Sequence, residues 1–453
     1  MSNTTRRHFL KQSVAAASLG VVPYFLSSQQ PAQAQAPSDR LRVGLVGVGG
    51  MGRGNGHDFS NLTDVVAIAD VDSEFGLAQT LNHNNIGTIR NGQKVRTPDA
   101  YKDYRRILDR NDIDIVAIST PDQWHVKPAI EALQAGKHVF CEKPLTLTIE
   151  EGELVRRAVR RYPNLVFKIG SQQRSQRDQF ARACLMVRRG MLGEIRRMTV
   201  DIHPGDTGGP FQVSTPPNSL DFNEWLGQSP LVNYIRQRTH GSFRWWYEYS
   251  GGKFTDWGAH HIDFAHWALN EVGEGQGPIS FEPTVAEHPV PFENGYPTVS
   301  NHFNTAHRYE ILCKFASGVE MVVASHTQDG CGILIEGTEG RMHVNRGRIA
   351  GRPIEEGRHE ALTDADYAEL ANGKPFDGWH KRNFITCIRE GGVPISDVIS
   401  HIQAMQSCHL CALAVRLNRK IEWNPKTETI IGDDHASTFL ARQQRRGYEI
   451  PRV

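Results

Sequence analysis

A glycine-rich turn, Gly47, Gly49 and Gly52, follows the apolar run of residues 43–46. G-x-G-x-x-G after a buried strand is typical of the turn that holds a dinucleotide pyrophosphate at the start of a helix. Free N–H groups and the positive end of the helix dipole suit that diphosphate. The residues of this turn that we expect to contact a cofactor are Gly47, Gly49, Gly50, Met51 and Gly52.

An acidic residue, Asp70, ends a second apolar run at residues 65–69, at about the separation expected for the acid that binds the ribose. A carboxylate accepts from both ribose hydroxyls, at about 1.5–3 kcal/mol for each charged hydrogen bond, and would repel a 2′-phosphate. Residues 71–73 contain no arginine. The sequence therefore favours NAD, with NADP as the alternative. A purely structural turn, with Asp70 capping a strand end, is the simpler interpretation.

Two strand ends carry further candidates for the cofactor side. Thr120 and Pro121 end one expected strand, where their backbone should lie near the ribose or nicotinamide. Lys143 follows another, and Pro144 excludes helix there. A lysine in a desolvated pocket beside the nicotinamide should have a lowered pKa and share a proton with a substrate hydroxyl. The alternative is a surface lysine in a polar loop.

The segment SGGKFTDWGAHHIDFAHWAL, residues 250–269, holds the third candidate group. A helix beginning near Asp256 would place Asp256 and His260 on one face, with Asp263 close to that face. An imidazole oriented by a carboxylate is the acid–base pair that alcohol oxidation requires. The alternative is a helix cap and a hydrogen-bonded core histidine. We expect no metal, either here or at Cys408 and Cys411, because neither place offers a complete ligand set.

The pattern of strands and helices predicts an α/β protein. Strands and helices alternate up to about residue 171, which predicts a doubly wound parallel sheet. The later strand-like runs predict an α+β domain with a large, mostly antiparallel open sheet. The expected domains are residues 40–171 and 172–453. The expected strands are 43–46, 65–69, 115–119, 139–141, 166–169, 197–202, 310–315, 320–325 and 332–337, and the expected helices are 101–109, 126–135, 149–161, 176–189, 379–390 and 398–417. Residues 82–97 are expected to form a surface loop.

Composition limits the classes of partner. The 453 residues carry a formal net charge of +1, so no basic excess is available to drive binding of nucleic acid. The seven cysteines are scattered and fit small core residues better than a disulfide framework.

The first 36 residues are expected to be an export signal and arm. Arg6 and Arg7 stand in a twin-arginine context, and a weakly apolar segment at residues 14–26 follows. Cleavage is expected after Ala34, and the alternative is a chance Arg-Arg pair. The prediction makes the twin-arginine export machinery a partner and the periplasm the location. Without a cofactor pool there, the cofactor would be held tightly and recycled in place.

The segments GLVGVGGMG, AIADVD, STPDQWH, AGKHVFCEKPL and GGKFTDWGAHHID have the order and spacing seen in the Gfo/Idh/MocA oxidoreductases. The chain resembles this family from Leu41 to its end, which implies a Rossmann domain joined to an open-sheet domain, and a homodimer or homotetramer. By motif, the resemblance assigns catalytic roles to Lys143, Asp256 and His260. Its cofactor-side positions are Gly47, Gly49, Gly52, Asp70, Thr120, His125 and Glu142. Lys253 departs from the family, because many members have a glycine there.

The resemblance implies an NAD(P)-dependent dehydrogenase that acts on a sugar, polyol or glycoside hydroxyl. One alternative is an NAD-dependent glycosidase or lyase that oxidises a ring hydroxyl transiently. Another is a non-catalytic sugar-binding protein. Gln173 and Arg244 are candidate substrate contacts. Trp245, Trp246, Tyr247 and Tyr249 could stack on a sugar ring or form core.

Overall fold

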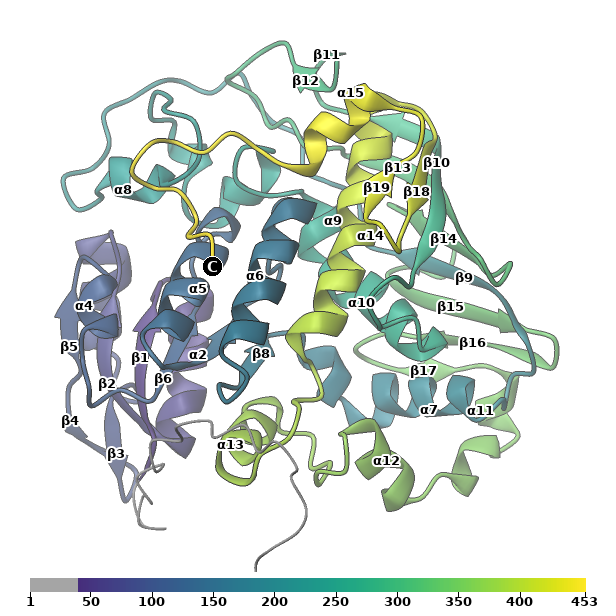
Figure 1. Cartoon of the computed structure of the whole chain (residues 1–453), viewed down its shortest axis with the longest axis horizontal. Helices are drawn as coiled ribbons and strands as arrows, with labels where there is room; N and C mark the ends of the chain where they lie inside the picture. The colour runs from purple at the N-terminus through teal and green to yellow at the C-terminus, as the bar shows by residue number, and fades with distance from the viewer. Residues whose placement is uncertain (1–39) are drawn as a thin grey trace, which may run out of the picture. The chain divides into compact units, whose positions relative to one another are not determined.

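The computed structural model describes residues 40–453, and the expected export signal and arm lie outside the described residues. The first half of this region forms a parallel sheet of six strands in the order β5-β2-β1-β6-β7-β8 (Figure 1). Its strands are β1 (Arg42–Val46), β2 (Asp64–Ala69), β5 (Asp99–Tyr101), β6 (Ile115–Ile118), β7 (His138–Cys141) and β8 (Phe167–Ile169). Continuous apolar runs form these strands because both faces of a parallel sheet are buried.

Helices cover both faces of this sheet, which confirms the doubly wound prediction. α5 (Val126–Gln134) and α6 (Ile149–Arg161) bury apolar side chains on one face. On the other face, Phe59 of α2 (Gly50–Leu62) packs with Phe384 of α13 (His380–Glu390). Strand order reverses between β1 and β6, and ligands of such sheets bind at this switch point.

The second sheet has nine strands in the order β17-β16-β15-β9-β14-β13-β10-β18-β19. Only the β9–β14 pair is parallel, so the expected mostly antiparallel sheet is confirmed. Its strands are β9 (Ile195–Asp201), β10 (Pro278–Glu287), β13 (Arg308–Phe315), β14 (Glu320–Ala324), β15 (Gly332–Gly337), β16 (Gly340–Val344), β17 (Ile349–Ala350), β18 (Ile421–Asn424) and β19 (Thr429–Ile430).

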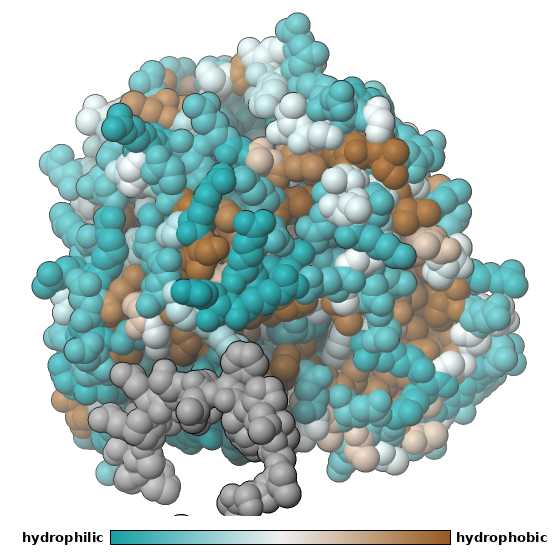
Figure 2. Space-filling model, in the orientation of Figure 1, coloured by the Kyte–Doolittle hydropathy of each residue, from teal (hydrophilic) through white to brown (hydrophobic). Residues whose placement is uncertain are grey.

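One long helix, α14 (Val398–Leu417), connects the two halves of the core. It contacts α6 of the first half as well as α10 (Gly258–Leu269) and β10 of the second (Figure 1). α14 is the single helix of residues 40–453 long and apolar enough to cross a membrane, and 89% of its most apolar window is buried inside the protein. It is therefore apolar because it is a core helix. On the face drawn in Figure 2 the surface is mainly hydrophilic, with hydrophobic side chains in small patches.

Two local predictions were wrong, and the domain boundary at residue 171 stays a prediction. Residues 82–97 contain a hairpin, β3 (Thr88–Arg90) with β4 (Gln93–Arg96), which a polar and glycine-rich composition concealed. The helix expected from residue 101 begins only at α4 (Arg105–Leu108), because Tyr101 still pairs with β2. The remaining short elements are α3 (Gln79–Leu81), α7 (Arg182–Arg188), α8 (Phe222–Leu226), α9 (Lys253–Asp256), β11 (Phe292–Glu293), β12 (Tyr296–Pro297), α11 (Arg352–Glu355), α12 (Asp364–Leu370) and α15 (Asp434–Ser437).

Candidate active site

The glycine turn lies between β1 and α2, as predicted, and its backbone is crowded. Gly47 has a φ of +77°, and a Cβ at this position would lie 2.7 Å from the backbone nitrogen of Thr120. A Cβ on Gly52 would lie 2.0 Å from the carbonyl oxygen of Gly47. Gly50 and Met51 begin α2, whose first N–H groups have no partner within the helix. The turn thus offers an anion the backbone donors that a pyrophosphate needs.

We expect Gly52→Ala to weaken NAD binding at least about tenfold, because the new methyl group forces the turn to shift. Measuring Kd by titration and the NAD content of purified protein would check this. Gly54→Ala is the matched control in the same helix, since its Cβ would meet nothing within 4 Å. Equal NAD binding by both variants would contradict the role of the close approach at Gly52.

Asp70 lies at the end of β2, where the sequence placed it, and lines the same cleft. One carboxylate oxygen accepts from the N–H of Val48 at 2.8 Å and the other from the N–H of Asp72 at 2.9 Å. Burial raises the pKa of Asp70 to about 6, although both N–H donors favour the ionised form. Each oxygen keeps acceptor capacity for a ribose hydroxyl.

The raised pKa predicts that NAD affinity depends on pH. Ionised Asp70 accepts from ribose hydroxyls, whereas the protonated carboxyl is a weaker acceptor, so affinity should fall as the pH drops through about 6. The loss should approach about tenfold per pH unit below that value and be absent above it. NAD titrations across this range would test it. Asp70→Asn should bind weakly at every pH, and a flat wild-type profile would count against Asp70 as the ribose ligand.

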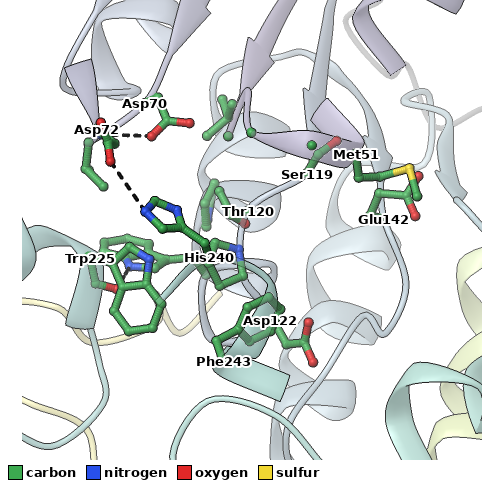
Figure 3. A pocket seen from close by; sticks show the side chains of 18 of the residues that line it. Met51, Asp70, Asp72, Ser119, Thr120, Asp122, Glu142, Trp225, His240 and Phe243 are labelled. Atoms are coloured by element: carbon green, nitrogen blue, oxygen red, sulfur yellow. Dashed lines mark hydrogen bonds and ion pairs between the residues drawn. The ribbon is translucent and has the colours of Figure 1, made fainter. Parts of the chain in front are cut away.

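Asp72, His240 and Trp225 also line the cleft, and the sequence pattern did not indicate any of the three. Asp72 caps the turn of residues 73–78 by accepting from the N–H groups of Glu74 and Phe75. Its other oxygen lies 3.6 Å from Nε2 of His240, which points toward it (Figure 3). His240 and Trp225 come from the part of the chain after residue 172, so both halves of the protein build this cleft.

The strand-end residues Thr120 and Pro121 line the cleft as expected, but His125 does not. The ring of His125 is buried between two backbone carbonyls, with Nδ1 2.5 Å from Pro144 O and Nε2 2.9 Å from Thr120 O. Burial lowers the pKa of His125, so the neutral ring donates to one of these carbonyls and only contacts the other. The ring thus lies between the loops after β6 and β7, and its predicted cofactor contact stays a prediction.

Glu142 lines the cleft on the nicotinamide side, and two neighbours hold its carboxylate. Asn55 of α2 donates to it at 2.9 Å, and a Cβ on Gly170 would lie 2.7 Å from the carboxylate carbon.

Asp122 is a further buried carboxyl in this lining. Burial raises the pKa of Asp122 to about 7, opposed by a hydrogen bond from Ser250. A buried acid that titrates near neutrality is a functional candidate that the sequence pattern did not reveal.

Lys143 and Asp256 meet at the end of the cleft, although 113 positions separate them. The Lys143 ammonium donates to Asp256 Oδ1 at 2.9 Å and to the Asp256 carbonyl at 3.0 Å. Arg244 and Lys253 each place a nitrogen 3.7 Å from Asp256 Oδ2. Burial alone would raise the pKa of Asp256, but these cations, Lys143 foremost, lower it to about 2. The site thus carries more positive than negative charge around one permanently ionised carboxylate.

The expected Asp256–His260 pair does not form. α9 (Lys253–Asp256) ends at Asp256, and α10 begins at Gly258, so the two residues do not share one continuous helix. His260 is buried, does not line the cleft formed by residues 40–453, and its buried Nδ1 has no hydrogen-bond partner there. Burial and the charge of Lys143 lower the pKa of His260 well below its usual value. The imidazole is therefore neutral at pH 7 and can accept a proton.

The candidate substrate contacts separate into one at the cleft and one behind it. Phe243 lines the cleft (Figure 3). Arg244 also lines it and faces Asp256. Gln173 is buried; with its amide oriented to satisfy both neighbours, it donates to the His260 carbonyl at 3.1 Å and accepts from Arg346 at 3.2 Å. Gln173 therefore positions the backbone of His260, which corrects its expected substrate contact.

Two of the four candidate stacking aromatics, Trp246 and Tyr249, and all cysteines but one follow the core interpretation, whereas Trp245 and Tyr247 are partly exposed. Trp246 and Tyr249 are fully buried in a cluster with Trp225 and Phe303. The seven cysteines are free, and all are buried except the half-buried Cys331. Trp246 and Tyr249 are therefore core residues and not exposed sugar-stacking residues. Cys408 and Cys411 of α14 are likewise buried core residues.

The completed cleft has a volume of about 490 Å³, within the usual range for cofactor sites. It runs from Asp70 past the glycine turn to Lys143 and Asp256. A Rossmann sheet with such a cleft is typical of the NAD-binding oxidoreductases. Two domain profiles of one oxidoreductase family match the chain. The profile of the NAD-binding Rossmann fold matches residues 41–169, and the profile of the C-terminal alpha/beta domain matches residues 205–450. The chain belongs to the Gfo/Idh/MocA oxidoreductase family.

Individual relatives are more distant. The chain is 33% identical over 215 residues to glycosyl hydrolase family 109 protein 1 of Shewanella sp. (strain MR-4), and 32% identical over 215 residues to an alpha-N-acetylgalactosaminidase of Shewanella oneidensis. Each match covers 43% of this chain and 45% of the relative, so the chain spans about half the length of these curated relatives.

Solved structures share the fold. The WlbA dehydrogenase from Bordetella pertussis, in complex with NADH and UDP-GlcNAcA, superposes with a TM-score of 0.59 at 18% identity, over 86% of this chain and 99% of that one. Aldose-aldose oxidoreductase from Caulobacter crescentus superposes with a TM-score of 0.57 at 19% identity, over 84% of this chain and 99% of that one. At these identities the likeness extends to the fold alone.

Proposed function

We propose that this protein is an NAD-dependent enzyme that oxidises a hydroxyl group of a sugar, polyol or glycoside. The observation that carries the proposal is the Lys143–Asp256 pair at the nicotinamide end of an NAD cleft. The fit of NAD rests on the crowded glycine turn, the unpartnered N–H groups of α2 and the carboxylate of Asp70. NAD, when bound, supplies the acceptor for a hydride from the carbon that bears the hydroxyl.

Each polar group at the end of the cleft has a separate role in this proposal. Asp256 stays ionised and holds the Lys143 ammonium in place. Lys143 donates a hydrogen bond to the substrate oxygen and stabilises the developing alkoxide, as preorganised cations do in buried sites. His260 is the base that the sequence predicts, and burial and the neighbouring lysine keep it neutral, but its ring does not line the cleft, so in this proposal the bound substrate must reach it behind the Lys143–Asp256 pair.

A second candidate function is cleavage of a glycoside without net oxidation. Oxidation of a ring hydroxyl to a ketone makes the neighbouring C–H acidic, and loss of that proton expels the aglycone. Water then adds, and the ketone is reduced again by the hydride removed at the start. The Shewanella relatives favour this form, because they are named glycosyl hydrolases and an alpha-N-acetylgalactosaminidase.

Location and assembly belong to the same proposal. We propose export through the twin-arginine route to the periplasm, and a homodimer or homotetramer. In the periplasm, NAD held tightly and recycled in place fits either a paired oxidation and reduction of sugars or the redox-neutral cleavage. The third candidate is a sugar-binding protein without catalysis. The charged pair of Lys143 and Asp256 makes this candidate less favoured, because binding alone does not require such a pair.

The deciding experiment incubates the full-length protein, purified with its bound NAD, with p-nitrophenyl glycosides and with free sugars. Release of nitrophenol and free sugar, without a net change in nicotinamide absorbance, would select cleavage. A stoichiometric change in absorbance with a sugar or polyol alone would select net oxidation. Binding of sugars with neither change, also in single-turnover mixing, would overturn an enzymatic function.

A further inference from the structure

Three metal-ligating side chains lie together on the second sheet, outside the NAD cleft. A carboxylate oxygen of Asp201, a ring nitrogen of His203 and the sulfur of Cys331 all lie within 4.8 Å of one another. None of the three lines the cleft formed by the described part of the chain. The sequence shows no sign of this cluster, because about 130 positions separate Cys331 from Asp201 and His203.

The fold prearranges this group. Asp201 ends β9 and pairs with Gly332, the first residue of β15, so Cys331 and His203 leave the sheet beside each other. One oxygen of Asp201 accepts from the N–H of His203 at 2.9 Å. The other accepts from the N–H and hydroxyl of Thr327 at 2.7 and 3.1 Å, which anchors the loop that carries Cys331. These donors orient the carboxylate and leave acceptor capacity on Oδ1, the oxygen that accepts from His203 N–H.

A fourth side chain, His343, lies on the same face of the sheet. It pairs with Leu334, two residues from Gly332 on β15, so its side chain lies on the same side as that of Asp201. Because Gly332 has no side chain, the ring occupies the space above it; a Cβ there would lie 2.6 Å from His343 Nε2. The side chain is buried, and its ring lies beside the backbone of Gly330 in the loop that carries Cys331.

We propose that Asp201, His203 and Cys331 bind a divalent d-block ion of the Zn²⁺ type. A thiolate, an imidazole and a carboxylate form a mixed ligand set that suits Zn²⁺ and excludes the oxygen-preferring Ca²⁺ and Mg²⁺. Water would complete the tetrahedral coordination.

The site would support the helix that carries the candidate catalytic residues. His261 of α10 places Nδ1 2.8 Å from the Asp201 carbonyl, and the rings of His203 and Trp257 pack edge to face at 5.1 Å. Trp257 lies between Asp256 and the start of α10. Because His203 packs on Trp257, a bound ion would connect the loop of Cys331 to the residue that follows Asp256. This inference does not depend on the proposed reaction.

Metal binding can be measured directly. The full-length protein, purified without chelators, is analysed for metal content, and chelator-treated protein is titrated with ZnSO₄ or CoCl₂. We expect one ion per chain and, with Co²⁺, a thiolate-to-metal charge-transfer band. Cys331→Ser and His203→Asn should lower affinity at least about 100-fold, and Cys331→Ser should abolish the band. Asparagine is chosen because His203 has a φ of +66°, a conformation that asparagine tolerates.

The control is His326→Asn, an exposed histidine on the same loop, which should bind metal like the wild type. Asp201 is left unchanged because it also anchors Thr327. Circular dichroism of each variant shows whether it is folded. The proposal is overturned if folded wild-type protein binds neither Zn²⁺ nor Co²⁺ stoichiometrically. It is equally overturned if the charge-transfer band persists in Cys331→Ser.

Discussion

Replacing Lys143 with alanine should lower turnover at least about 100-fold while the protein stays folded and keeps its NAD. The Lys143 ammonium is the donor at the end of the cleft, 2.9 Å from Asp256 Oδ1. Its loss leaves a developing alkoxide without its nearest positive charge. Asp256 remains compensated by Arg244 and Lys253, so folding should survive. Single-turnover kinetics and the NAD content of the purified variant separate the chemical step from cofactor binding.

The matched control is Lys253→Ala, a second lysine that faces the same carboxylate. Its nitrogen lies 3.7 Å from Asp256 and forms no hydrogen bond to it, so we expect a much smaller loss of turnover. If Lys143→Ala turned over as fast as the wild type, Lys143 would have no role in the chemistry. If instead the variant lost its NAD, the lysine would serve the cofactor and not the substrate hydroxyl.

The second large effect concerns stability. Asp263→Asn should lower the free energy of unfolding by about 3–5 kcal/mol, because it leaves a buried arginine without its counter-charge. Arg174 donates to the two oxygens of Asp263 at 2.7 and 2.8 Å, and the two side chains are 2% and 1% exposed. Ser171 adds a third hydrogen bond at 3.1 Å. Denaturant unfolding followed by circular dichroism would measure the change.

The pH dependence of this pair has a defined sign. Burial would raise the pKa of Asp263, but Arg174 lowers it to about 2, below the value of 3.8 for an unperturbed aspartate. Its contribution to stability is therefore full above pH 3.8 and is lost as the pH falls through about 2. Asp58→Asn is the control, because its ion pair with Lys381 is half exposed and should contribute about 0–1 kcal/mol. Equal stability of the two variants would contradict the expected asymmetry.

The sequence predicted the features that depend on local chemistry. Apolar runs predicted the five core strands of the Rossmann sheet, because both faces of that sheet are buried. The glycine turn was predictable because only glycine fits its close contacts, and Asp70 because an acid at the end of the second strand is part of the same dinucleotide pattern. The hairpin of residues 88–96 was missed because its polar strands lack an apolar pattern.

Partners across the chain could not be predicted in this way. Asp256 was expected to orient His260, on the assumption of one continuous helix; the break at Trp257 redirects it to Lys143. Asp263 was placed near the same face, yet it pairs with Arg174 in the core. His125 and Gln173 matched functional positions, but the ring of His125 contacts backbone carbonyls and Gln173 contacts the His260 carbonyl and the Arg346 side chain.

By itself, therefore, the order of residues determined the parallel sheet, the dinucleotide turn, the ribose acid and the segments from which a reactive group could come. Only the tertiary structure decided which charges meet: Lys143 with Asp256, Arg174 with Asp263, and Asp201 with His203 and Cys331. The physical reason is that backbone conformation follows from neighbouring residues. An ion pair or a ligand set instead depends on where the packing of distant strands and helices brings side chains that share no local pattern.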